Sequence, residues 1–273
     1  MSGKLERAYQ RSERICMNSQ SKIVCMSDCH RGVGNQGDNF LPNENLFLAA
    51  LQYYYEKCFW YMELGDGDEL WENRDFMRIQ EMHSDVFAML ERFYGNGRLR
   101  MLYGNHDCQK KFGKDCIHEG VILENCTTGH ELFLVHGHQG DWLNDTFWPL
   151  ARFLVRYVWK PLEGLGVSDP TSAARNYKKC KKAEKRLDDF SAKKNLLVLA
   201  GHTHRPILPK PGEGRYLNDG SCVHPRTITA MEIENGMITL VKWVVTVRLN
   251  QTLAVGREIM AGPYVLEHYW QPK

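Results

Sequence analysis

The sequence lacks several features that would place it in special classes of protein. No apolar run is long enough to cross a bilayer, and the first twenty residues are polar and charged where a secretory signal has an apolar centre. The nine cysteines include no Cys-x-x-Cys pair, which argues against a disulfide framework and against a thiolate zinc site. There is also no internal repeat and no low-complexity tract. These absences predict a soluble cytoplasmic protein in which most cysteines are small buried hydrophobic residues.

The composition is that of a globular protein with an uneven distribution of charge. With 273 residues, 43% of them hydrophobic, the chain can bury a sizeable core, and we expect one domain spanning residues 1–273. The formal net charge is only +2, yet residues 151–194 hold 12 Lys or Arg and 5 Asp or Glu. A basic segment of this kind either attracts an anionic ligand or forms a solvated helical face.

Three short apolar runs in the first half each end in a polar cluster. Residues 22–26 lead into Asp28-Cys29-His30, residues 59–64 into Gly65-Asp66, and residues 99–103 into Gly104-Asn105-His106-Asp107. Periodic segments at 43–57 and 75–94 are long enough to be helices between these strands. The alternation predicts a parallel sheet whose strand ends carry the polar clusters.

The second half predicts two more such strands, an inserted region and a hairpin. Residues 131–135 and 196–200 end in His136-Gly137-His138 and Gly201-His202-Thr203-His204. Residues 226–233 and 237–245 alternate around an Asn-Gly turn, which favours a hairpin in a second, antiparallel-edged sheet. We therefore expect an α/β fold, a two-sheet α/β/β/α sandwich with a helical insertion at 142–194 acting as a lid. Its expected helices are 145–160 and 171–194.

Seven side chains just beyond these strands are potential metal ligands, namely Asp28, His30, Asp66, Asn105, His136, His202 and His204. Any single histidine of this set is more often structural than metal-binding. Five clusters that each follow a strand favour a common site. If Asp66 is shared, the donors provide two sites of four protein ligands each, which leaves positions open for water and substrate, as in catalytic centres.

The five motifs resemble the signatures of the calcineurin-like metallophosphoesterases, in the order typical of that family. The resemblance implies a first metal bound by Asp28, His30, Asp66 and His204 and a second bound by Asp66, Asn105, His136 and His202, with Asp66 as the bridge. It implies Mn²⁺ as the usual ion, with Fe, Zn or Ni as alternatives. Asp68 and Glu69 are expected in the second shell or at the surface.

Two cations about 4 Å apart would activate a hydroxide and neutralise the charge that develops during an in-line displacement. His106 is then the candidate for donating a proton to the leaving oxygen, with Asp107 fixing its tautomer. Candidate substrate contacts are Arg31, Arg152 and Arg156, although Arg31 is equally consistent with an ordinary surface arginine.

The substrate class stays open at this point. The sequence of residues 201–206 and the helical insertion resemble those of the UDP-2,3-diacylglucosamine pyrophosphatase branch of the family. This resemblance implies an anionic, amphipathic substrate and peripheral membrane contact through the lid. The third and fourth motifs instead have the general phosphoesterase forms, so a small phosphomonoester, nucleotide or other diphosphate fits as well. The alternatives are a protein Ser/Thr phosphatase, a cyclic-nucleotide phosphodiesterase or a catalytically silent metal-binding scaffold. A nucleic-acid partner is disfavoured, because lysines predominate in the basic segment without interleaved aromatic residues.

Overall fold

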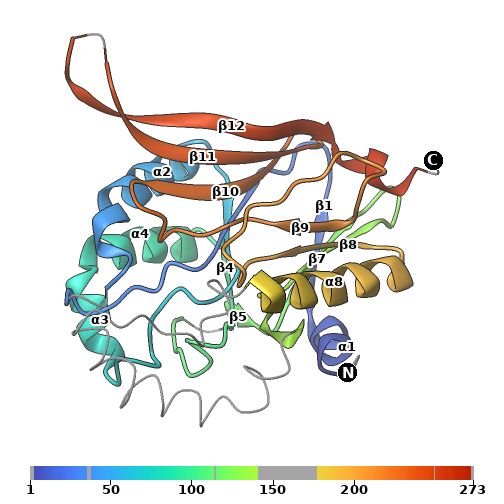
Figure 1. Ribbon diagram of the computed structural model, residues 1–273, viewed down its shortest axis with the longest axis horizontal. Coiled ribbons are helices and arrows are strands. Elements are labelled where there is room, and N and C mark those ends of the chain that lie inside the picture. The colour runs from blue at the N-terminus through green and yellow to red at the C-terminus, as the bar shows by residue number, and fades with distance from the viewer. Residues whose placement is uncertain (1–2, 36–37, 114, 141–176, 249, 272–273) are drawn as a thin grey trace.

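Two β-sheets lie face to face at the centre of the molecule, and helices cover their outer faces (Figure 1). The computed structural model describes residues 3–35, 38–113, 115–140, 177–248 and 250–271. Together the layers form an α/β/β/α sandwich, which confirms the predicted fold class. A segment that is apolar on both faces, such as residues 23–26, forms a strand here because both faces of its sheet are covered.

The seven-stranded sheet has the order β12-β11-β10-β2-β3-β4-β5. Its members are β2 (Ile23–Met26), β3 (Trp60–Glu63), β4 (Leu99–Leu102), β5 (Ile117–His118), β10 (Thr227–Glu234), β11 (Met237–Val247) and β12 (Leu253–Val265). The strands β2 to β5 are parallel, as predicted, whereas β10 to β12 are antiparallel. The turn between β10 and β11 has positive φ at Asn235 and Gly236, as a tight hairpin turn requires.

The five-stranded sheet has the order β1-β6-β7-β8-β9. Its members are β1 (Glu13–Met17), β6 (Val121–Asn125), β7 (Glu131–Leu134), β8 (Leu197–Ala200) and β9 (Tyr216–Asn218). The prediction that the C-terminal hairpin belongs to a second sheet is wrong, because β10 pairs with β2 and extends the first sheet. The hairpin turn was readable from local sequence, whereas its partner strand is chosen by long-range packing.

Helices form the two outer layers. The α-helices are α1 (Gly3–Arg11), α2 (Glu44–Glu56), α3 (Phe76–Met82), α4 (Ser84–Gly95) and α8 (Tyr177–Lys194), and short 3₁₀ turns are η1 (Leu41–Asn43), η2 (His138–Gly140) and η4 (Leu266–Trp270). Helices α2 and α4 pack on the seven-stranded sheet, and α1 and α8 on the five-stranded sheet (Figure 1). The single helix predicted at 75–94 is broken at His83, whose side chain is buried against Asp38 and Glu44.

Three hydrophobic clusters correspond to the three interfaces between layers. One lies between the seven-stranded sheet and α2 to α4, and it is rich in aromatic residues such as Phe47, Tyr61 and Phe93. A second, mostly aliphatic cluster lies between the two sheets. The third joins the five-stranded sheet to α1 and α8. The sandwich is therefore held together by apolar burial on every face of each sheet.

Helix α8 belongs to the sandwich, which corrects part of the predicted insertion. Its Leu187 and Phe190 are buried in the cluster with Ile122 and Phe133, while Lys178, Lys181, Lys182 and Lys185 are exposed. Residues 177–194 are thus an outer layer of the fold and not part of a separate lid. The predicted helix at 145–160, with Arg152 and Arg156, lies outside the described residues.

The cysteines and the helices allow two further comparisons with the sequence. Cys16 and Cys126 form a disulfide, with their Cα atoms 5.6 Å apart, so the expectation of no disulfide is corrected for this pair. Five other cysteines are buried and two, Cys58 and Cys108, are exposed. Over the described ranges, none of the helices combines the length and the apolar character that crossing a membrane requires.

Candidate metal centre

The seven predicted ligands converge where strands of both sheets end. Five of them have backbone φ in the left-handed region, which non-glycine residues rarely adopt: Asp28 (53°), His30 (50°), Asp66 (49°), His202 (65°) and His204 (55°). Such conformations are costly and concentrate at functional sites, where the surrounding fold enforces them. Here each one turns a side chain at a strand end toward a common region of the molecule.

The first group of donors consists of Asp28, His30 and His204. His204 Nε2 lies 3.0 Å from Asp28 Oδ1 and 3.4 Å from His30 Nε2. The other oxygen of Asp28, Oδ2, accepts hydrogen bonds from the hydroxyl of Ser27 and from the backbone N–H of His202. Asp28 Oδ1 is buried and accepts no well-oriented hydrogen bond from any described residue. One carboxylate oxygen and two imidazole nitrogens therefore point at one place.

The second group consists of Asp66, His136 and His202, with Asn105 beside it. His136 Nε2 lies 3.1 Å from Asp66 Oδ2 and 3.3 Å from Asn105 Oδ1. His136 Nδ1 donates to the carbonyl oxygen of Leu64 over 2.8 Å, which places the proton on Nδ1. Nε2 is then the nitrogen available to a cation, and the hydrogen bond to Leu64 fixes the orientation of the ring.

Asp66 connects the two groups. Its Oδ1 accepts a hydrogen bond of 2.7 Å from the backbone N–H of His106, whereas Oδ2 lies 3.1 Å from His136 Nε2 and 4.0 Å from His30 Nε2. Burial alone would raise the pKa of Asp66, but the charges of His136 and His106 hold it well below the ordinary value. In turn, burial would lower the pKa of His136, and the Asp66 carboxylate raises it to about 9. The buried carboxylates therefore require nearby positive charge, which imidazolium groups or bound cations can supply.

Glycines beside Asp66 allow the loops to approach this closely. A Cβ atom on Gly65 would lie 2.8 Å from the imidazole Cγ of His136, and Gly65 also has a φ of 90°. A Cβ atom on Gly104 would overlap the carboxylate of Asp66. The glycines of the second and third motifs thus make room for the ligands of the neighbouring strand.

Glu69 orients both His30 and His106, a role that the sequence did not assign to it. His106 Nδ1 lies 2.9 Å from Glu69 Oε1, and His30 Nδ1 lies 3.0 Å from Glu69 Oε2. The His106 ring also stacks on Trp71, with ring centroids 4.2 Å apart. Burial would lower the pKa of His106, but the carboxylates of Glu69 and Asp66 raise it to about 10. Glu69 was expected either behind the ligands or at the surface, and the structure buries it; its position three residues after Asp66 in the same turn was the available signal.

Asp107 does not fix the tautomer of His106, which corrects that prediction. Its carboxylate accepts hydrogen bonds from the backbone N–H groups of Gly104, at 2.7 Å, and Gly67, at 3.0 Å. Burial raises the pKa of Asp107 to about 6. Asp107 therefore ties together the loops that carry the second and third motifs.

Arg31 is not placed to contact a substrate. Its side chain is 0% exposed and forms ion pairs with Glu63, at 2.8 Å, and Asp68, at 2.7 Å. Lys110 reaches the same two carboxylates, at 2.7 and 2.6 Å. Arg31, Lys110, Glu63 and Asp68 thus form a buried group of four charges. Through Asp68, this group holds the loop that follows Asp66. The sequence alone could not distinguish Arg31 from a surface arginine, because the partners of Arg31 are distant along the chain.

Two histidines without an assigned ligand role also lie next to the centre. The ring centroid of His138 is 5.4 Å from that of His136. Nε2 of His224 donates a hydrogen bond of 3.0 Å to the backbone carbonyl oxygen of His204.

The fold and the paired donor groups together define an α/β/β/α sandwich with a candidate metal centre, and comparison with known proteins identifies its family. The family model for calcineurin-like phosphoesterases matches residues 21–206, which is more than half of the sequence. The chain therefore belongs to the calcineurin-like phosphoesterase family.

Solved structures provide more distant matches. The chain is similar to vacuolar protein sorting 29 from Cryptosporidium parvum, with 13% identity, 89% of this chain and 98% of that chain covered, and a TM-score of 0.45. It is also similar to Vps29 from Chaetomium thermophilum, with 11% identity, coverages of 89% and 97%, and a TM-score of 0.43. A search of curated proteins found no match.

Proposed function

We propose that the chain is a dinuclear metal-dependent phosphoesterase, which hydrolyses a phosphoester or pyrophosphate bond in a small phosphorylated substrate. The observation that carries this proposal is the pair of donor groups around Asp66, whose Oδ2 lies near one histidine of each group. A shared carboxylate between two sets of imidazoles is the arrangement that a two-metal centre needs.

The residues present fit two divalent cations. The first would be held by Asp28, His30, Asp66 and His204, and the second by Asp66, Asn105, His136 and His202. The buried Asp28 Oδ1, which accepts no well-oriented hydrogen bond from a described residue, supports this assignment. Mixed oxygen and imidazole donors without thiolate suit Mn²⁺, and also Fe, Zn or Ni. When bound, such cations would supply Lewis acidity and an activated water.

His106 is the residue of this chain best placed to donate a proton to the leaving oxygen. Its Nδ1 is engaged by Glu69, so Nε2 is the nitrogen left to meet a substrate. The side chain is 22% exposed and its ring lies 4.7 Å from that of His30. Stacking on Trp71 restricts rotation of the ring, so the donor is oriented before a substrate arrives.

Metal reconstitution tests the proposal directly. The full chain is stripped with a chelator, refilled separately with Mn²⁺, Fe²⁺, Zn²⁺ or Ni²⁺, and assayed with p-nitrophenyl phosphate, bis-p-nitrophenyl phosphate, nucleoside diphosphate sugars and phosphopeptides. We expect two equivalents of metal per chain and metal-dependent hydrolysis of a small substrate. Two bound metals without hydrolysis of any substrate would favour the metal-binding scaffold, and failure to bind metal would refute the proposed centre.

The same panel separates the substrate classes. Preference for nucleoside diphosphate sugars would support the UDP-2,3-diacylglucosamine pyrophosphatase-like alternative, and preference for phosphopeptides would support a protein phosphatase. Cyclic nucleotides extend the panel to phosphodiester cleavage. The proposed lid contact with membranes, and the proposed substrate contacts of Arg152 and Arg156, fall on residues outside those described and need separate variants.

A further inference from the structure

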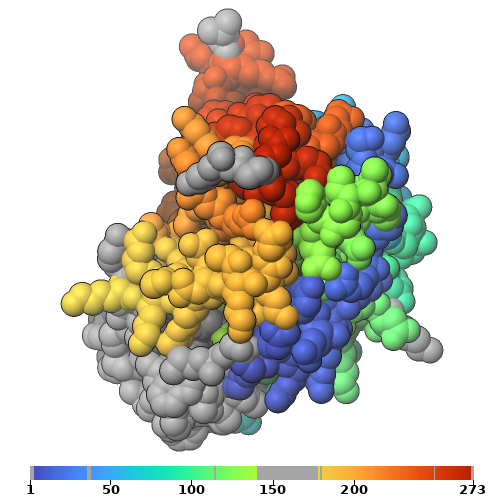
Figure 2. Space-filling view, turned by 90° about the vertical axis from the view of Figure 1, so that its right-hand side faces the viewer, coloured from blue at the N-terminus to red at the C-terminus, as the bar shows by residue number. Residues whose placement is uncertain are grey.

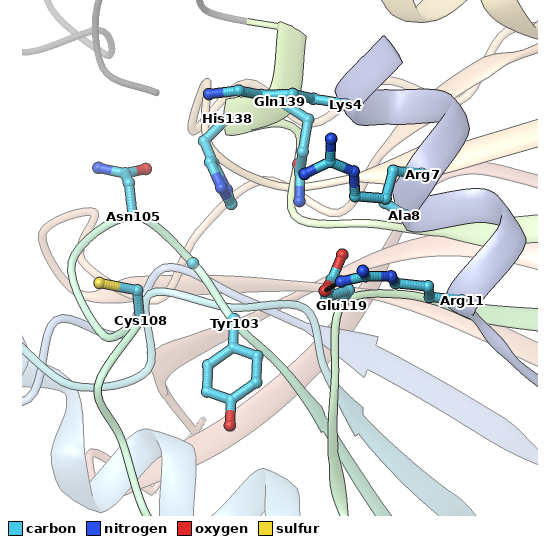
Figure 3. A pocket seen from close by; sticks show the side chains of 11 residues that line it. Lys4, Arg7, Ala8, Arg11, Tyr103, Asn105, Cys108, Glu119, His138 and Gln139 are labelled. Carbon is cyan, nitrogen blue, oxygen red and sulfur yellow. Dashed lines mark hydrogen bonds and ion pairs between the residues drawn. The ribbon is translucent and has the colours of Figure 1, made fainter. Parts of the chain in front are cut away.

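A pocket of about 330 Å³ opens beside the candidate metal centre, between its ligand loops and helix α1. One wall is formed by Asn105 of the third motif and by Cys108, which follows that motif; another is formed by His138 of the fourth motif and by Gln139, which follows it. Figure 3 shows the side chains of α1 entering from the opposite side. A substrate phosphate held near Asn105 would therefore have the rest of its molecule next to α1.

Helix α1 presents a cationic face to this pocket. Lys4, Arg7 and Arg11 are spaced at i, i+3 and i+7, so they share one side of the helix, and all three line the pocket. Beside this face lie Leu5 and Ala8, which are buried against the five-stranded sheet, and Ala8 also lines the pocket. Burial of these two side chains fixes which way the helix faces.

Two contacts on other sides of α1 also hold its position. Tyr9 donates a hydrogen bond to Glu131 over 2.6 Å, and Lys194 of α8 forms an ion pair with Glu6 at 2.6 Å. Figure 2 shows α1 and α8 side by side on the outside of the five-stranded sheet. The helix is thus fixed to the sandwich on the sides that do not line the pocket.

The charges around the pocket do not cancel. Glu119 is the one carboxylate among its lining residues, and it pairs with Arg11 at 2.8 Å. Arg7 lines the pocket, and the described part of the chain offers it no carboxylate within ion-pair distance. In addition, Nδ1 of His138 is buried and has no hydrogen-bond partner among the described residues. The wall of the pocket therefore offers a ligand the guanidinium of Arg7, which has no carboxylate partner among the described residues.

We propose that this pocket is a substrate subsite, which selects phosphorylated molecules that carry a second anionic group, a carboxylate or a phosphate, beyond the bond that is cleaved. Arg7 is its principal anion ligand, and Lys4 adds positive charge at the mouth. The proposal rests on the proposed phosphoesterase function for the identity of the first phosphate. Guanidinium groups suit this role because their fork of donors matches carboxylate and phosphate oxygens.

Binding of non-hydrolysable ligands tests the subsite. The ligands are 4-carboxyphenylphosphonate and its neutral carboxamide, the longer pair 6-phosphonohexanoate and its amide, and benzene-1,4-bisphosphonate. Each is titrated calorimetrically into the Mn²⁺-loaded full chain. We expect at least one acid to bind about fivefold more tightly than its amide, the size of effect that an exposed ion pair can give. Comparison of the carboxylate with the bisphosphonate shows which second anion is preferred.

Substitutions assign the effect to α1. Arg7→Gln should remove most of the difference between acid and amide while leaving amide binding unchanged, and Lys4→Gln should reduce the difference. The matched control is Arg248→Gln, which removes an exposed arginine from the hairpin of β11 and β12, outside the pocket lining. Equal affinity for acid and amide, including no detectable binding of either, would overturn the proposal, as would a difference that survives in the Lys4→Gln/Arg7→Gln double variant.

The two proposals can fail independently. If the chain hydrolyses no substrate but still prefers the acids through Arg7, the phosphoesterase function fails and the anion subsite stands. If it hydrolyses p-nitrophenyl phosphate and treats acid and amide alike, the function stands and the subsite fails.

Discussion

Replacement of Glu69 by glutamine should test whether this carboxylate orients His106 and His30, because it leaves the seven candidate metal donors unchanged. The carboxylate is 5% exposed and accepts from His106 Nδ1 at 2.9 Å and from His30 Nδ1 at 3.0 Å. Burial would raise the pKa of Glu69, but His106 and His30 lower it to about 2, so it is ionised at neutral pH. Glutamine has nearly the same shape, but it is neutral and has a single acceptor oxygen. The substitution therefore removes the negative charge that both imidazole rings share.

The size of the effect follows from the interactions lost. A hydrogen bond to a charged group contributes about 1.5–3 kcal/mol, and loss of a group that orients a metal ligand typically costs about 10- to 100-fold in metal affinity or activity. We expect Glu69→Gln to lower kcat/KM by about 10- to 100-fold and to weaken one of the two metal sites, the one that contains His30. The second site, built around His136, should keep its affinity.

The assay combines calorimetric titration of Mn²⁺ into the stripped chain with hydrolysis of p-nitrophenyl phosphate at saturating metal. The control is Glu81→Gln, an equal change of charge at an exposed position of α3. Unchanged metal affinity and unchanged turnover in Glu69→Gln would refute the orienting role. An equal loss in both variants would mean that net charge, and not the hydrogen bonds to the two rings, produces the effect.

Three further predictions concern the centre and its surroundings. Asp66→Asn should abolish turnover through loss of metal, whereas His106→Ala should abolish turnover with both metals retained. Metal analysis and hydrolysis of p-nitrophenyl phosphate distinguish the two variants, and activity in either variant would contradict the role assigned to that residue. Gly104→Ala should weaken metal binding and destabilise the fold by about 1–3 kcal/mol, because the new methyl group overlaps Asp66. In thermal unfolding, Gly95→Ala, with no atom within 4 Å of the added carbon, should have no such effect. Burial lowers the pKa of His83, but Asp38 and Glu44 raise this pKa above 6.5 overall. The contribution of protonated His83 to the stability of the fold is therefore complete below pH 6.5 and is lost as the pH rises through the raised pKa. The difference in unfolding free energy between wild type and His83→Gln, measured by urea denaturation, should therefore shrink from pH 6 to pH 9; a constant difference would contradict this.

Much of the candidate site was predictable because its residues follow from short sequence motifs. Apolar runs of strand length that end in Asp, Asn or His place these residues at strand ends, and parallel strands bring such ends to one edge of a sheet. The ends of β2, β3 and β4 confirm this for Asp28, Asp66 and Asn105. The two histidine motifs follow β7 and β8 of the other sheet in the same way. The roles of these residues as metal ligands remain a prediction.

The predictions that the structure corrects failed for a common physical reason. Arg31 and Asp107 were assigned by proximity along the chain to a motif, but their partners are Glu63, Asp68 and two backbone N–H groups of other loops. The helix α1 was not predicted, since nine mostly polar residues carry a weak helical signal and its helix is held by burial of Leu5 and Ala8. Its place beside the ligand loops could not be inferred from a sequence separation of about a hundred residues.

By itself, the amino-acid sequence determined the strand-and-loop framework that carries the candidate donor residues and the hairpin turn at Asn235-Gly236, because each depends on side chains within a few residues of one another. Only the tertiary structure decided which sheet the hairpin joins, that Glu69 and not Asp107 holds His106, that Arg31 is buried, and that α1 faces a pocket beside Asn105. These features depend on which apolar faces pack together and on which buried charges find partners, and both are settled by contacts between segments far apart in the chain.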